Sequence, residues 1–579
     1  MTMEDFRDSL LKYLFVEKKL EEDDAAKQKN MTREEKVENS LLLINVTIKK
    51  QEEYFYELCV PDNYSKLRAG DKVVIVNEDS HSEYEATIID VFFDTLTISC
   101  DKELDPNATY SIEQKSPELL QALISCLEGI YSGVPGAAFL RLLSGEEKFE
   151  TVDFLKVNID DVPYFDSVKN KLNQEQLSAV SSMLEYPPVH VLQGPPGTGK
   201  TAVLAATAIA TAHLNREVVI IANTHHAVNN ALQKIRSMDK KTTLIKVGSA
   251  LKSEELDDTV LKFEKFSEYY EYSYKNRKKK RTGHIIGMTI WGAITHLGLR
   301  HHAHFRPYIS LVDEASLMPL SLATILGKTA PSVCLFGDSR QMPPIFRPEL
   351  ERNENSISIL DYCSQKVEGV PVIALRTTYR MNKDITDVVS KSFYEPYGII
   401  LQSAETVAGN LFQSTYMDGN KYQDSVVFTD PSISTPHCQE ENIGEADAVV
   451  EMVKALIEEG KKHEGIAVIT PFRKQVRLLR SKAQEVLPIE ELPLIDTVER
   501  LQGQDVDCII LTFATSDNGY IKEIHDFLFN PNRLNVMISR AKTKVIIYAS
   551  EQVQKELKNI LVGWNMKDTS DWHLFHGDV

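Results

Sequence analysis

The sequence predicts an α/β protein in which two parallel-sheet domains follow one another along the chain. From Leu172 onward, short apolar runs alternate with helix-compatible stretches, as expected for parallel strands joined by crossover helices. These runs are too many for one small sheet, and a phosphate-binding motif accompanies only the first of them. The runs lie at residues 189–192, 217–222, 308–312, 332–336, 370–375, 426–428, 466–469, 508–512 and 545–548.

The phosphate-binding motif fits G-x-x-x-x-G-K-[ST] at every fixed position, between an apolar strand and the helix-compatible run Ala202–Leu214. Gly197 and Gly199 let successive N–H groups point at one oxyanion, and the helix N-terminus adds the positive end of its dipole. Lys200 supplies a charge for the outer phosphates, and the Thr201 hydroxyl can ligate Mg²⁺. We therefore expect ATP to be bound by Gly194, Pro195, Pro196, Gly197, Thr198, Gly199, Lys200 and Thr201.

Two carboxylates, Asp313 and Glu314, directly follow the apolar run at 308–312. Beside a phosphate-binding loop, this pair predicts that Asp313 holds Mg²⁺ and that Glu314 orients or deprotonates the attacking water. The next apolar run leads into Leu335–Pro344, which contains Gln341 and a rigid Pro-Pro pair. This segment could place the Gln341 amide near the γ-phosphate.

Two arginines of the second half, Arg380 and Arg540, are candidate catalytic cations. Phosphoryl transfer needs cations on the developing γ-phosphate charge, and such arginines contribute about 10³–10⁵ in rate. The half that carries the phosphate-binding loop offers no obvious candidate. Arginines from a second domain would couple hydrolysis to domain closure.

The first 170 residues have a different pattern. Between residues 41 and 115, the β-branched runs Val73–Val76, Ala86–Val91 and Thr95–Ile98 are separated by turn residues, which predicts a small antiparallel barrel. We expect five regions: an N-terminal helical segment (1–40), a β-barrel domain (41–115), a helical region (116–170) that the resemblance described below identifies as a stalk, a first α/β domain (171–345) with an insertion at 251–284, and a second α/β domain (346–579).

The predicted insertion is charged and tyrosine-rich, and it interrupts the sheet pattern, so we expect the fold to tolerate its loss. It carries the basic run Lys275–Arg281, just after Tyr269, Tyr270, Tyr272 and Tyr274. Two interpretations stay open. The run either grips a phosphate backbone or forms a solvated loop tip.

The amino-acid composition excludes few classes of function. The formal net charge of −19 does not exclude a nucleic-acid partner, because a local basic groove sets phosphate affinity. No apolar run approaches the length of a membrane span, so we expect no membrane partner. Seven scattered cysteines without a C-x-x-C pair favour a reducing compartment. We expect a cytoplasmic protein, or a nuclear one in a eukaryote.

In chain order, the motifs resemble those of the superfamily 1 helicases, specifically the 5′→3′ (1B) branch typified by the up-frameshift helicase of nonsense-mediated decay and by senataxin. The resemblance covers residues 172 to about 550. Its segments are Leu172–Val180 (Q motif), Ala222–Asn229 (motif Ia), Leu311–Ser316 (motif II), Gly337–Gln341 (motif III), Thr378–Asn382 (motif IV), Thr470–Gln475 (the segment after it), Thr497–Asp507 (motif V) and Arg533–Lys542 (motif VI).

The resemblance implies two RecA-like domains, with a barrel flanked by stalk helices (1B-like) and an inserted subdomain (1C-like). It implies that Gln176 reads adenine, that Tyr379 stacks on it and that Asp505 holds the ribose. Gln341, Arg380 and Arg540 would sense or stabilise the γ-phosphate. Position relative to the motifs makes five residues candidates for touching nucleic acid: Thr224, Thr289, Pro471, Phe472 and Thr497.

The sequence departs from the family pattern in two motifs. Motif Ia has His225 and Asn229 where Asn and Asp are usual. Motif V has Glu499, Leu501 and Asp505 where Asp, Phe and Glu are usual. These departures concern the grip on nucleic acid and the ribose contact, and they leave the residues for ATP hydrolysis intact.

The leading functional hypothesis is an ATP-dependent 5′→3′ helicase or translocase on single-stranded DNA or RNA, with a larger nucleic-acid-processing complex as a further candidate partner. The alternative is an ATP-gated clamp or motor subunit that remodels a nucleoprotein or protein complex with little unwinding. A small-molecule kinase would leave motifs IV to VI without a role. DNA and RNA are not distinguished, because the discriminating contacts to the 2′-hydroxyl have no sequence signal here.

Overall fold

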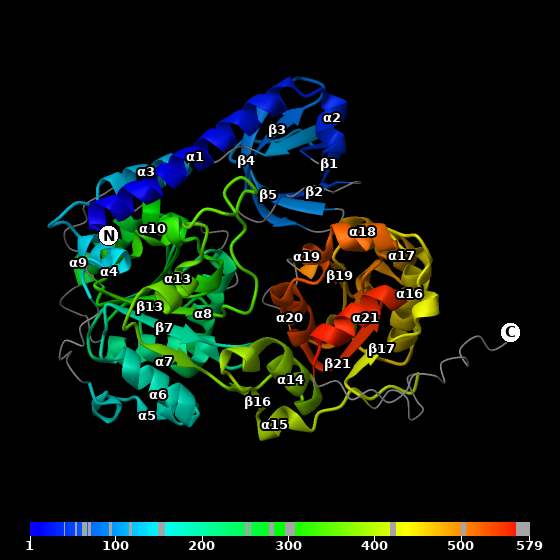
Figure 1. The fold of residues 1–579 in the computed structure, drawn as a ribbon. Coiled ribbons are helices and arrows are strands. Elements are labelled where there is room, and N and C mark those ends of the chain that lie inside the picture. The colour runs from blue at the N-terminus through cyan, green and yellow to red at the C-terminus, as the bar shows by residue number, and fades with distance from the viewer. Residues whose placement is uncertain are drawn as a thin grey trace.

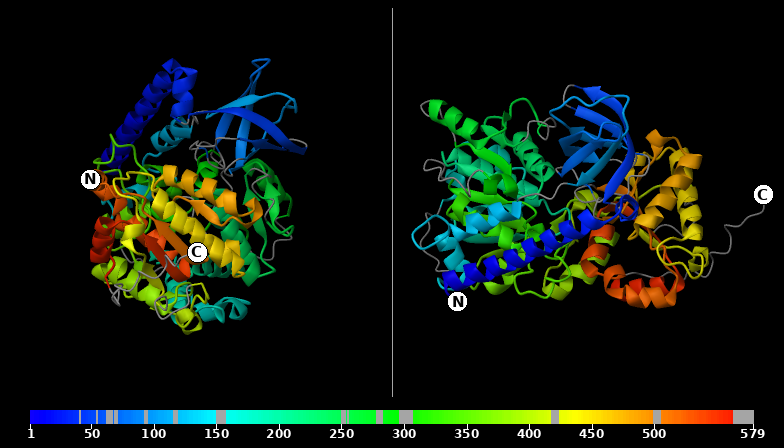
Figure 2. Two further views of the ribbon diagram at one scale, coloured as in Figure 1. Left: turned by 90° about the vertical axis from the view of Figure 1, so that its right-hand side faces the viewer. Right: turned by 90° about the horizontal axis from the view of Figure 1, so that it is seen from above.

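The computed structural model describes residues 1–39, 41–52, 55–60, 67, 71–91, 95–114, 119–148, 157–248, 253, 256–276, 283–295, 307–416, 424–498 and 505–562. Two α/β bodies lie side by side, with a small barrel above them (Figure 1). A long N-terminal helix runs from the first α/β body to the barrel, which is also seen from above in Figure 2.

The barrel confirms the predicted small antiparallel domain. Its strands are β1 (Leu42–Glu52), β2 (Phe55–Cys59), β3 (Lys72–Asn77), β4 (Glu83–Val91), β5 (Thr95–Ser99) and β6 (Tyr110–Gln114). They close in the order β1-β2-β5-β4-β3-β6, with every neighbouring pair antiparallel. Alternate side chains of β3, among them Val73 and Ile75, fill the interior, as the two-residue period of a strand requires.

Four helices connect the barrel to the first α/β body: α1 (Met3–Asn30), α2 (Arg33–Glu38), α3 (Leu119–Glu128) and α4 (Ala137–Ser144). The side chain of Thr2 caps α1 by accepting from the N–H of Asp5. Buried residues on one side of α1, including Phe6 and Leu10, pack in one cluster with apolar residues of α3 and α4. The first 30 residues and the segment after the barrel therefore form a single helical stalk.

The first α/β domain contains an eight-stranded sheet in the order β10-β9-β11-β8-β12-β13-β7-β14, with all pairs parallel. Alternate residues of β8 face opposite sides: Val218 and Ile220 lie in one core cluster, and Val219 and Ile221 in the other. The strands are β7 (Val189–Gln193), β8 (Val218–Ala222), β9 (Leu244–Val247), β10 (Leu261–Phe263), β11 (Ile285–Thr289), β12 (Ile309–Val312), β13 (Ser332–Gly337) and β14 (Val372–Ala374).

Helices cover both faces of this sheet, as expected for a parallel sheet. One face is covered by α5 (Asp166–Lys169), α6 (Gln174–Met183), α7 (Lys200–His213) and α8 (His225–Met238). The other is covered by the stalk and by α9 (Phe266–Asn276), α10 (Ile290–Ala293), α11 (Leu320–Ala323), α12 (Leu326–Thr329) and α13 (Ile359–Lys366).

The predicted domain boundary at 345/346 is wrong in one respect. Strand β14 pairs with β7 in the first sheet, although the apolar run at 370–375 was assigned to the second domain. Helix α13 likewise places Ile359, Leu360 and Cys363 in the core of the first domain. By packing, the first domain therefore extends to Leu375, because these two elements close one side of its sheet.

The predicted insertion is also more integrated than expected. Strand β10 extends the first sheet by pairing with β9, and α9 buries Phe266 and Tyr269 in the main core. The Tyr269 hydroxyl lies 3.2 Å from Nδ1 of His284. Loss of 251–284 would therefore remove part of the first sheet and of its core, which argues against the expectation that the fold tolerates it.

The second α/β domain has a five-stranded parallel sheet in the order β17-β21-β20-β18-β19. Its strands are β17 (Val426–Phe428), β18 (Ile466–Ile469), β19 (Leu494–Asp496), β20 (Val506–Thr512) and β21 (Ala541–Tyr548). Its helices are α14 (Lys383–Val389), α15 (Glu405–Ala408), α16 (Ile443–Glu458), α17 (Arg473–Val486), α18 (Asn518–Glu523), α19 (His525–Leu528), α20 (Pro531–Ser539) and α21 (Glu551–Ile560).

The second domain begins with the two-stranded sheet of β15 (Thr377–Thr378) and β16 (Gln402–Ser403). Between these strands lie α14 and a π-helix at Ser390–Tyr394 that continues it, and both pack in the core of this domain. Two RecA-like domains with an N-terminal barrel are thus the observed architecture. Within the described part of the chain, no helix has the length and apolar character needed to cross a membrane.

Candidate ATP site

The phosphate-binding loop connects β7 to α7 and places both of its later glycines in the left-handed region, with φ of 73° at Gly197 and 85° at Gly199. A Cβ atom at Gly197 would lie 2.5 Å from Cβ of Arg380 and from Oγ1 of Thr378. A Cβ atom at Gly199 would lie 2.5 Å from Nε2 of Gln176. Glycine is therefore required at both positions by conformation and by close approach.

The charges of Lys200 and Glu314 both act on the Asp313 carboxylate. The Lys200 ammonium donates to the Gly194 carbonyl. Burial and the neighbouring Glu314 charge raise the pKa of Asp313, and the Lys200 charge opposes that rise. Glu314 has a φ of 54°, which is uncommon for a residue with a side chain and typical of strained functional positions. The structure thus brings three predicted catalytic residues to the carboxyl ends of β7 and β12.

The second half of the chain forms one wall of this loop. The Tyr379 N–H donates to the Gly197 carbonyl at 2.8 Å, and the Thr378 hydroxyl donates to the Pro196 carbonyl at 2.8 Å. The segment after β14 is held from the other side by Glu175, whose carboxylate accepts from the N–H groups of Arg376 and Thr377. Motif IV therefore contacts the loop directly through its backbone.

The predicted adenine-binding residues lie beside the same loop. Gln176 is buried, and its amide nitrogen donates to the Thr198 carbonyl at 3.0 Å while its amide oxygen accepts from the N–H of Asn173. Tyr379 is 44% exposed, and its hydroxyl accepts from the Asn173 amide at 2.8 Å. Tyr379 therefore lies at the surface beside the loop, and Gln176 is tied to the loop itself.

Both predicted arginines contact Asp505. Nη2 of Arg380 lies 2.6 Å from Oδ1 of Asp505, and Nη1 of Arg540 lies 3.8 Å from the same oxygen. Burial and the neighbouring Arg540 lower the pKa of Arg380 to about 10, although Asp505 opposes this change. Among the described residues, Nε of each arginine is buried without a hydrogen-bond partner. Two cations that share one carboxylate form a site suited to a further anion, and Asp505, predicted to hold ribose, balances them.

Gln341 follows β13, which lies between β7 and β12 in the sheet. Its amide nitrogen donates to Oδ2 of Asp338 at 2.8 Å. Oδ1 of Asp338 accepts from Nε2 of Gln193 at 2.5 Å, at the end of the strand that enters the phosphate-binding loop. Asp338 thus fixes the Gln341 segment beside that loop.

The predicted nucleic-acid contacts gather at the carboxyl ends of the two sheets. Thr224 follows β8 and caps α8, and Thr289 ends the neighbouring strand β11. In the second domain, Pro471 and Phe472 follow β18, and Thr497 follows the neighbouring strand β19. Thr289, Phe472 and Thr497 are largely buried, so each offers only a small surface.

Some predicted features lie outside the described residues. These are most of the basic run at 275–281 and the centre of motif V at 499–504. Lys275 lies within the described residues. Its side chain is exposed, and its Nζ lies 3.6 Å from Oε2 of Glu271 on α9.

Four residues of the site escaped the sequence analysis as candidates: Asn173, Glu175, Asp338 and Tyr394. The first three lie within the Q motif and motif III, so these motifs are the local signal that marks them. Tyr394 has no local signal. It donates to Oδ2 of Asp338, which lies 56 positions earlier in the chain.

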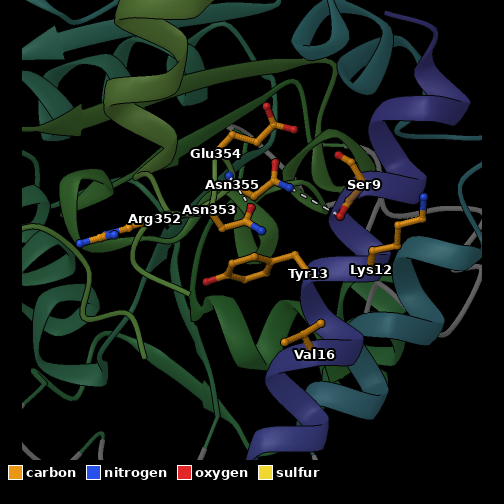
Figure 3. A pocket seen from close by; sticks show the side chains of 8 residues that line it. All are labelled: Ser9, Lys12, Tyr13, Val16, Arg352, Asn353, Glu354 and Asn355. Carbon is orange, nitrogen blue, oxygen red and sulfur yellow. Dashed lines mark hydrogen bonds between the residues drawn. The ribbon is translucent and has the colours of Figure 1, made fainter. Parts of the chain in front are cut away.

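A separate hollow of about 520 Å³ lies where the stalk meets the first domain (Figure 3). Tyr13 and Val16 of α1 line one side and residues 352–355 the other, and the Asn355 amide reaches the Ser9 carbonyl. Arg347 nearby pairs with Asp24 of α1 at 2.6 Å. The hollow therefore belongs to the attachment of the stalk, and no residue of the phosphate-binding loop lines it.

Comparison with known proteins supports this architecture. Two models of the AAA domain match in tandem, one over residues 171–353 and the other over residues 356–552. The DNA replication ATP-dependent helicase/nuclease dna2 of Schizosaccharomyces pombe is 27% identical over 66% of this chain and 28% of its own length. The DNA-binding protein SMUBP-2 of Mesocricetus auratus is 24% identical over 82% of this chain and 52% of its own.

The chain thus spans about a quarter to a half of the length of these curated relatives. Among solved structures, the arterivirus nonstructural protein 10 helicase aligns with 89% of this chain and 80% of its own, at 13% identity and a TM-score of 0.41.

The tandem AAA-domain matches, the similarity to helicases and the order of motifs around one nucleotide site agree with each other. These three lines agree that the two α/β domains are AAA domains similar to those of superfamily 1 helicases such as dna2, which is consistent with the motif resemblance to the up-frameshift and senataxin type.

Proposed function

We propose that the chain is an ATP-driven 5′→3′ helicase or translocase on single-stranded nucleic acid. The observation that carries this proposal is the contact of motif IV with the phosphate-binding loop, from the Tyr379 N–H to the Gly197 carbonyl. Because residues of both halves meet at one loop, a change in the bound phosphates would alter how the two domains lie together. Such a cycle of opening and closing is the movement a motor requires.

Mg²⁺ would be held by the Thr201 hydroxyl and the Asp313 carboxylate. These oxygen ligands suit a hard cation, and the buried Asp313 carboxylate gains from a neighbouring positive charge. The ion would neutralise phosphate charge during transfer. Lys200 binds the outer phosphates, and Glu314 orients the attacking water. Arg380 and Arg540 stabilise the γ-phosphate charge as it develops, with Asp505 between them.

The nucleic-acid strand would cross the carboxyl ends of both sheets. Thr224 and Thr289 would contact it from the first domain, and Pro471, Phe472 and Thr497 from the second. Hydroxyls suit the phosphate backbone, and the small exposed part of Phe472 would contact a base, so binding would be sequence-tolerant and sensitive to salt. The named relatives act on or bind DNA, which favours DNA without excluding RNA. We propose that the protein acts in the cytoplasm or a nucleus, and the seven cysteines, none of them in a disulfide, support this proposal.

An unwinding assay tests this proposal. Duplexes with a 5′ overhang, a 3′ overhang or blunt ends are incubated with ATP and the protein, and Lys200→Ala serves as the inactive control. We expect ATP-dependent unwinding of the 5′-overhang duplex alone. Faster unwinding of the 3′-overhang duplex would contradict the polarity. Strand-stimulated ATPase without unwinding of any duplex would instead favour the clamp that remodels a nucleoprotein complex.

A further inference from the structure

A buried chain of hydrogen bonds crosses from the first domain to the second at motif III. Oδ2 of Asp338 accepts from the Gln341 amide at 2.8 Å and from the Tyr394 hydroxyl at 2.6 Å. Tyr394 ends the π-helix at Ser390–Tyr394, and its ring belongs to the core of the second domain. One carboxylate oxygen therefore joins a candidate γ-phosphate sensor of the first domain to a tyrosine of the second.

The same hydroxyl is also linked to the helix that precedes Arg540. Nδ2 of Asn535, on α20, donates to the Tyr394 hydroxyl at 2.8 Å and to the Arg340 carbonyl at 2.6 Å. These two contacts use both hydrogens of that amide. Arg540 is the C-cap residue of α20, five positions after Asn535. The Tyr394 hydroxyl thus lies between the segment of Gln341 and the helix of Arg540.

The contacts exclude water. Asp338 is 2% exposed, and Tyr394 and Asn535 are 0% exposed. A buried carboxylate is costly unless donors surround it, and Asp338 accepts on Oδ1 from Nε2 of Gln193 and on Oδ2 from Tyr394. Burial and the adjacent Asp338 charge raise the pKa of Tyr394 well above its ordinary value, so the hydroxyl remains a donor.

A purely structural role for Tyr394 explains its ring but not its hydroxyl. The ring fills the core of the second domain, where phenylalanine would pack equally well. The hydroxyl instead satisfies a carboxylate of the first domain, across the interface. The π-helix at Ser390–Tyr394 brings the Tyr394 hydroxyl to this interface. Single π-helical turns are rare in proteins, and those that occur often lie at functional sites.

We propose that Tyr394 is a positioning residue for ATP hydrolysis. Its hydroxyl, held between Asp338 and Asn535, ties the segment of Gln341 to the helix of Arg540, so that both side chains reach the γ-phosphate together. The inference rests on the ATP-hydrolysing part of the proposed function, and it requires neither unwinding nor a given polarity.

Steady-state ATPase kinetics of Tyr394→Phe test this role. Turnover is measured with saturating nucleic-acid strand and expressed per molecule that binds nucleotide, so that a misfolded fraction does not count. We expect kcat to fall roughly tenfold, since a buried charged hydrogen bond contributes about that factor. We expect KM for ATP to stay within about twofold, because the hydroxyl does not touch the phosphate-binding loop.

A matched control is Tyr362→Phe, which removes a tyrosine hydroxyl of the first domain that donates to the Leu143 carbonyl away from the site. This control should leave kcat unchanged. Asn535→Leu removes the second half of the link and should lower kcat by a similar factor. The double variant Tyr394→Phe/Asn535→Leu should be no slower than the slower single variant, because both changes break one connection.

Three results would overturn the inference: a wild-type kcat for Tyr394→Phe, a loss confined to KM, or strictly additive effects in the double variant. If Tyr394→Phe does not fold, the kcat of Asn535→Leu serves as the test. A wild-type kcat for Asn535→Leu would then overturn the proposal. Failure of the proposed function gives a different result, since the wild-type protein itself would then show no ATP turnover or no response to strand.

Discussion

Lys200 shows how much of the nucleotide site depends on a single charge. Its ammonium extends along the loop to the Gly194 carbonyl and is not part of any apolar core. We expect Lys200→Ala to abolish ATP turnover while the protein stays folded, because the charge acts on phosphates. Phosphate release measures the ATP turnover of the variant, and thermal melting shows whether the variant is folded. Turnover within tenfold of wild type would contradict the assignment of the phosphate-binding loop.

Glu314 occupies a left-handed backbone position directly after the buried Asp313. We expect Glu314→Gln to bind ATP with near-normal affinity and to hydrolyse it at least a hundredfold more slowly, because the amide keeps the volume but cannot accept the proton of water. Binding of a fluorescent nucleotide and single-turnover hydrolysis separate the two steps. Loss of nucleotide binding would show instead that Glu314 supports the loop.

Arg380 and Arg540 meet at Asp505, so each replacement changes the charge balance of the other. We expect Arg380→Ala and Arg540→Ala each to lower kcat by roughly a thousandfold and to raise KM for ATP much less, because both act on charge that develops in the transition state. Steady-state kinetics decide this. A variant whose whole loss lies in KM would be inconsistent with such a role.

At the residue scale, local motifs predicted the nucleotide site because a phosphate-binding loop is a local object. Spacing within eight residues defines the turn, the helix N-terminus and the lysine. The Tyr394 contact had no such signal, since Asp338 and Asn535 lie 56 and 141 positions away in the chain. Only the folded arrangement of both domains brings them together.

At the scale of elements, unbroken apolar runs predicted the buried parallel strands well. Strand β9 was missed because Lys246 interrupts its apolar run, although the structure buries this lysine completely. Strand β11 was missed because it contains Gly287 and follows a charged segment. Strand β14 was recognised but assigned to the wrong sheet, because the partner of a strand is a property of the whole fold.

The segment of β10 and α9 gives a prediction at the same scale. We expect deletion of 251–284 with a short linker to destabilise the protein strongly, since each buried aromatic side chain that is lost from the core costs about 3–5 kcal/mol. The loss of stability is measured by thermal melting and by the solubility of the deletion variant. A deletion variant that melts within about 3 °C of wild type would contradict the integration of this segment into the first sheet.

The basic run of this segment therefore needs a gentler test than deletion. Glutamine substitutions across Lys275–Arg281 remove charge and keep side-chain length. If the run grips a phosphate backbone, the dependence of strand affinity on salt concentration should become less steep. An unchanged slope would leave the solvated loop tip as its role.

At the scale of the whole molecule, the stalk links the nucleotide site to the barrel. Helix α1 packs on the first domain and leads to the barrel, and Asp24 pairs with Arg347, six residues after Gln341. The barrel and the two sheets were predicted from strand patterns, and the family resemblance placed the stalk. The exact extent of each domain was not predictable, because α13 and β14 pack on the first sheet after a long loop.

The rate of ATP hydrolysis with single-stranded DNA, with single-stranded RNA and without nucleic acid tests the central claim most directly. A strand across both domains should favour the closed arrangement in which Arg380 and Arg540 reach the phosphate. We therefore expect faster turnover with at least one of the two strands, and no turnover in Lys200→Ala. Equal turnover of the wild-type protein under all three conditions would contradict a motor that works on nucleic acid.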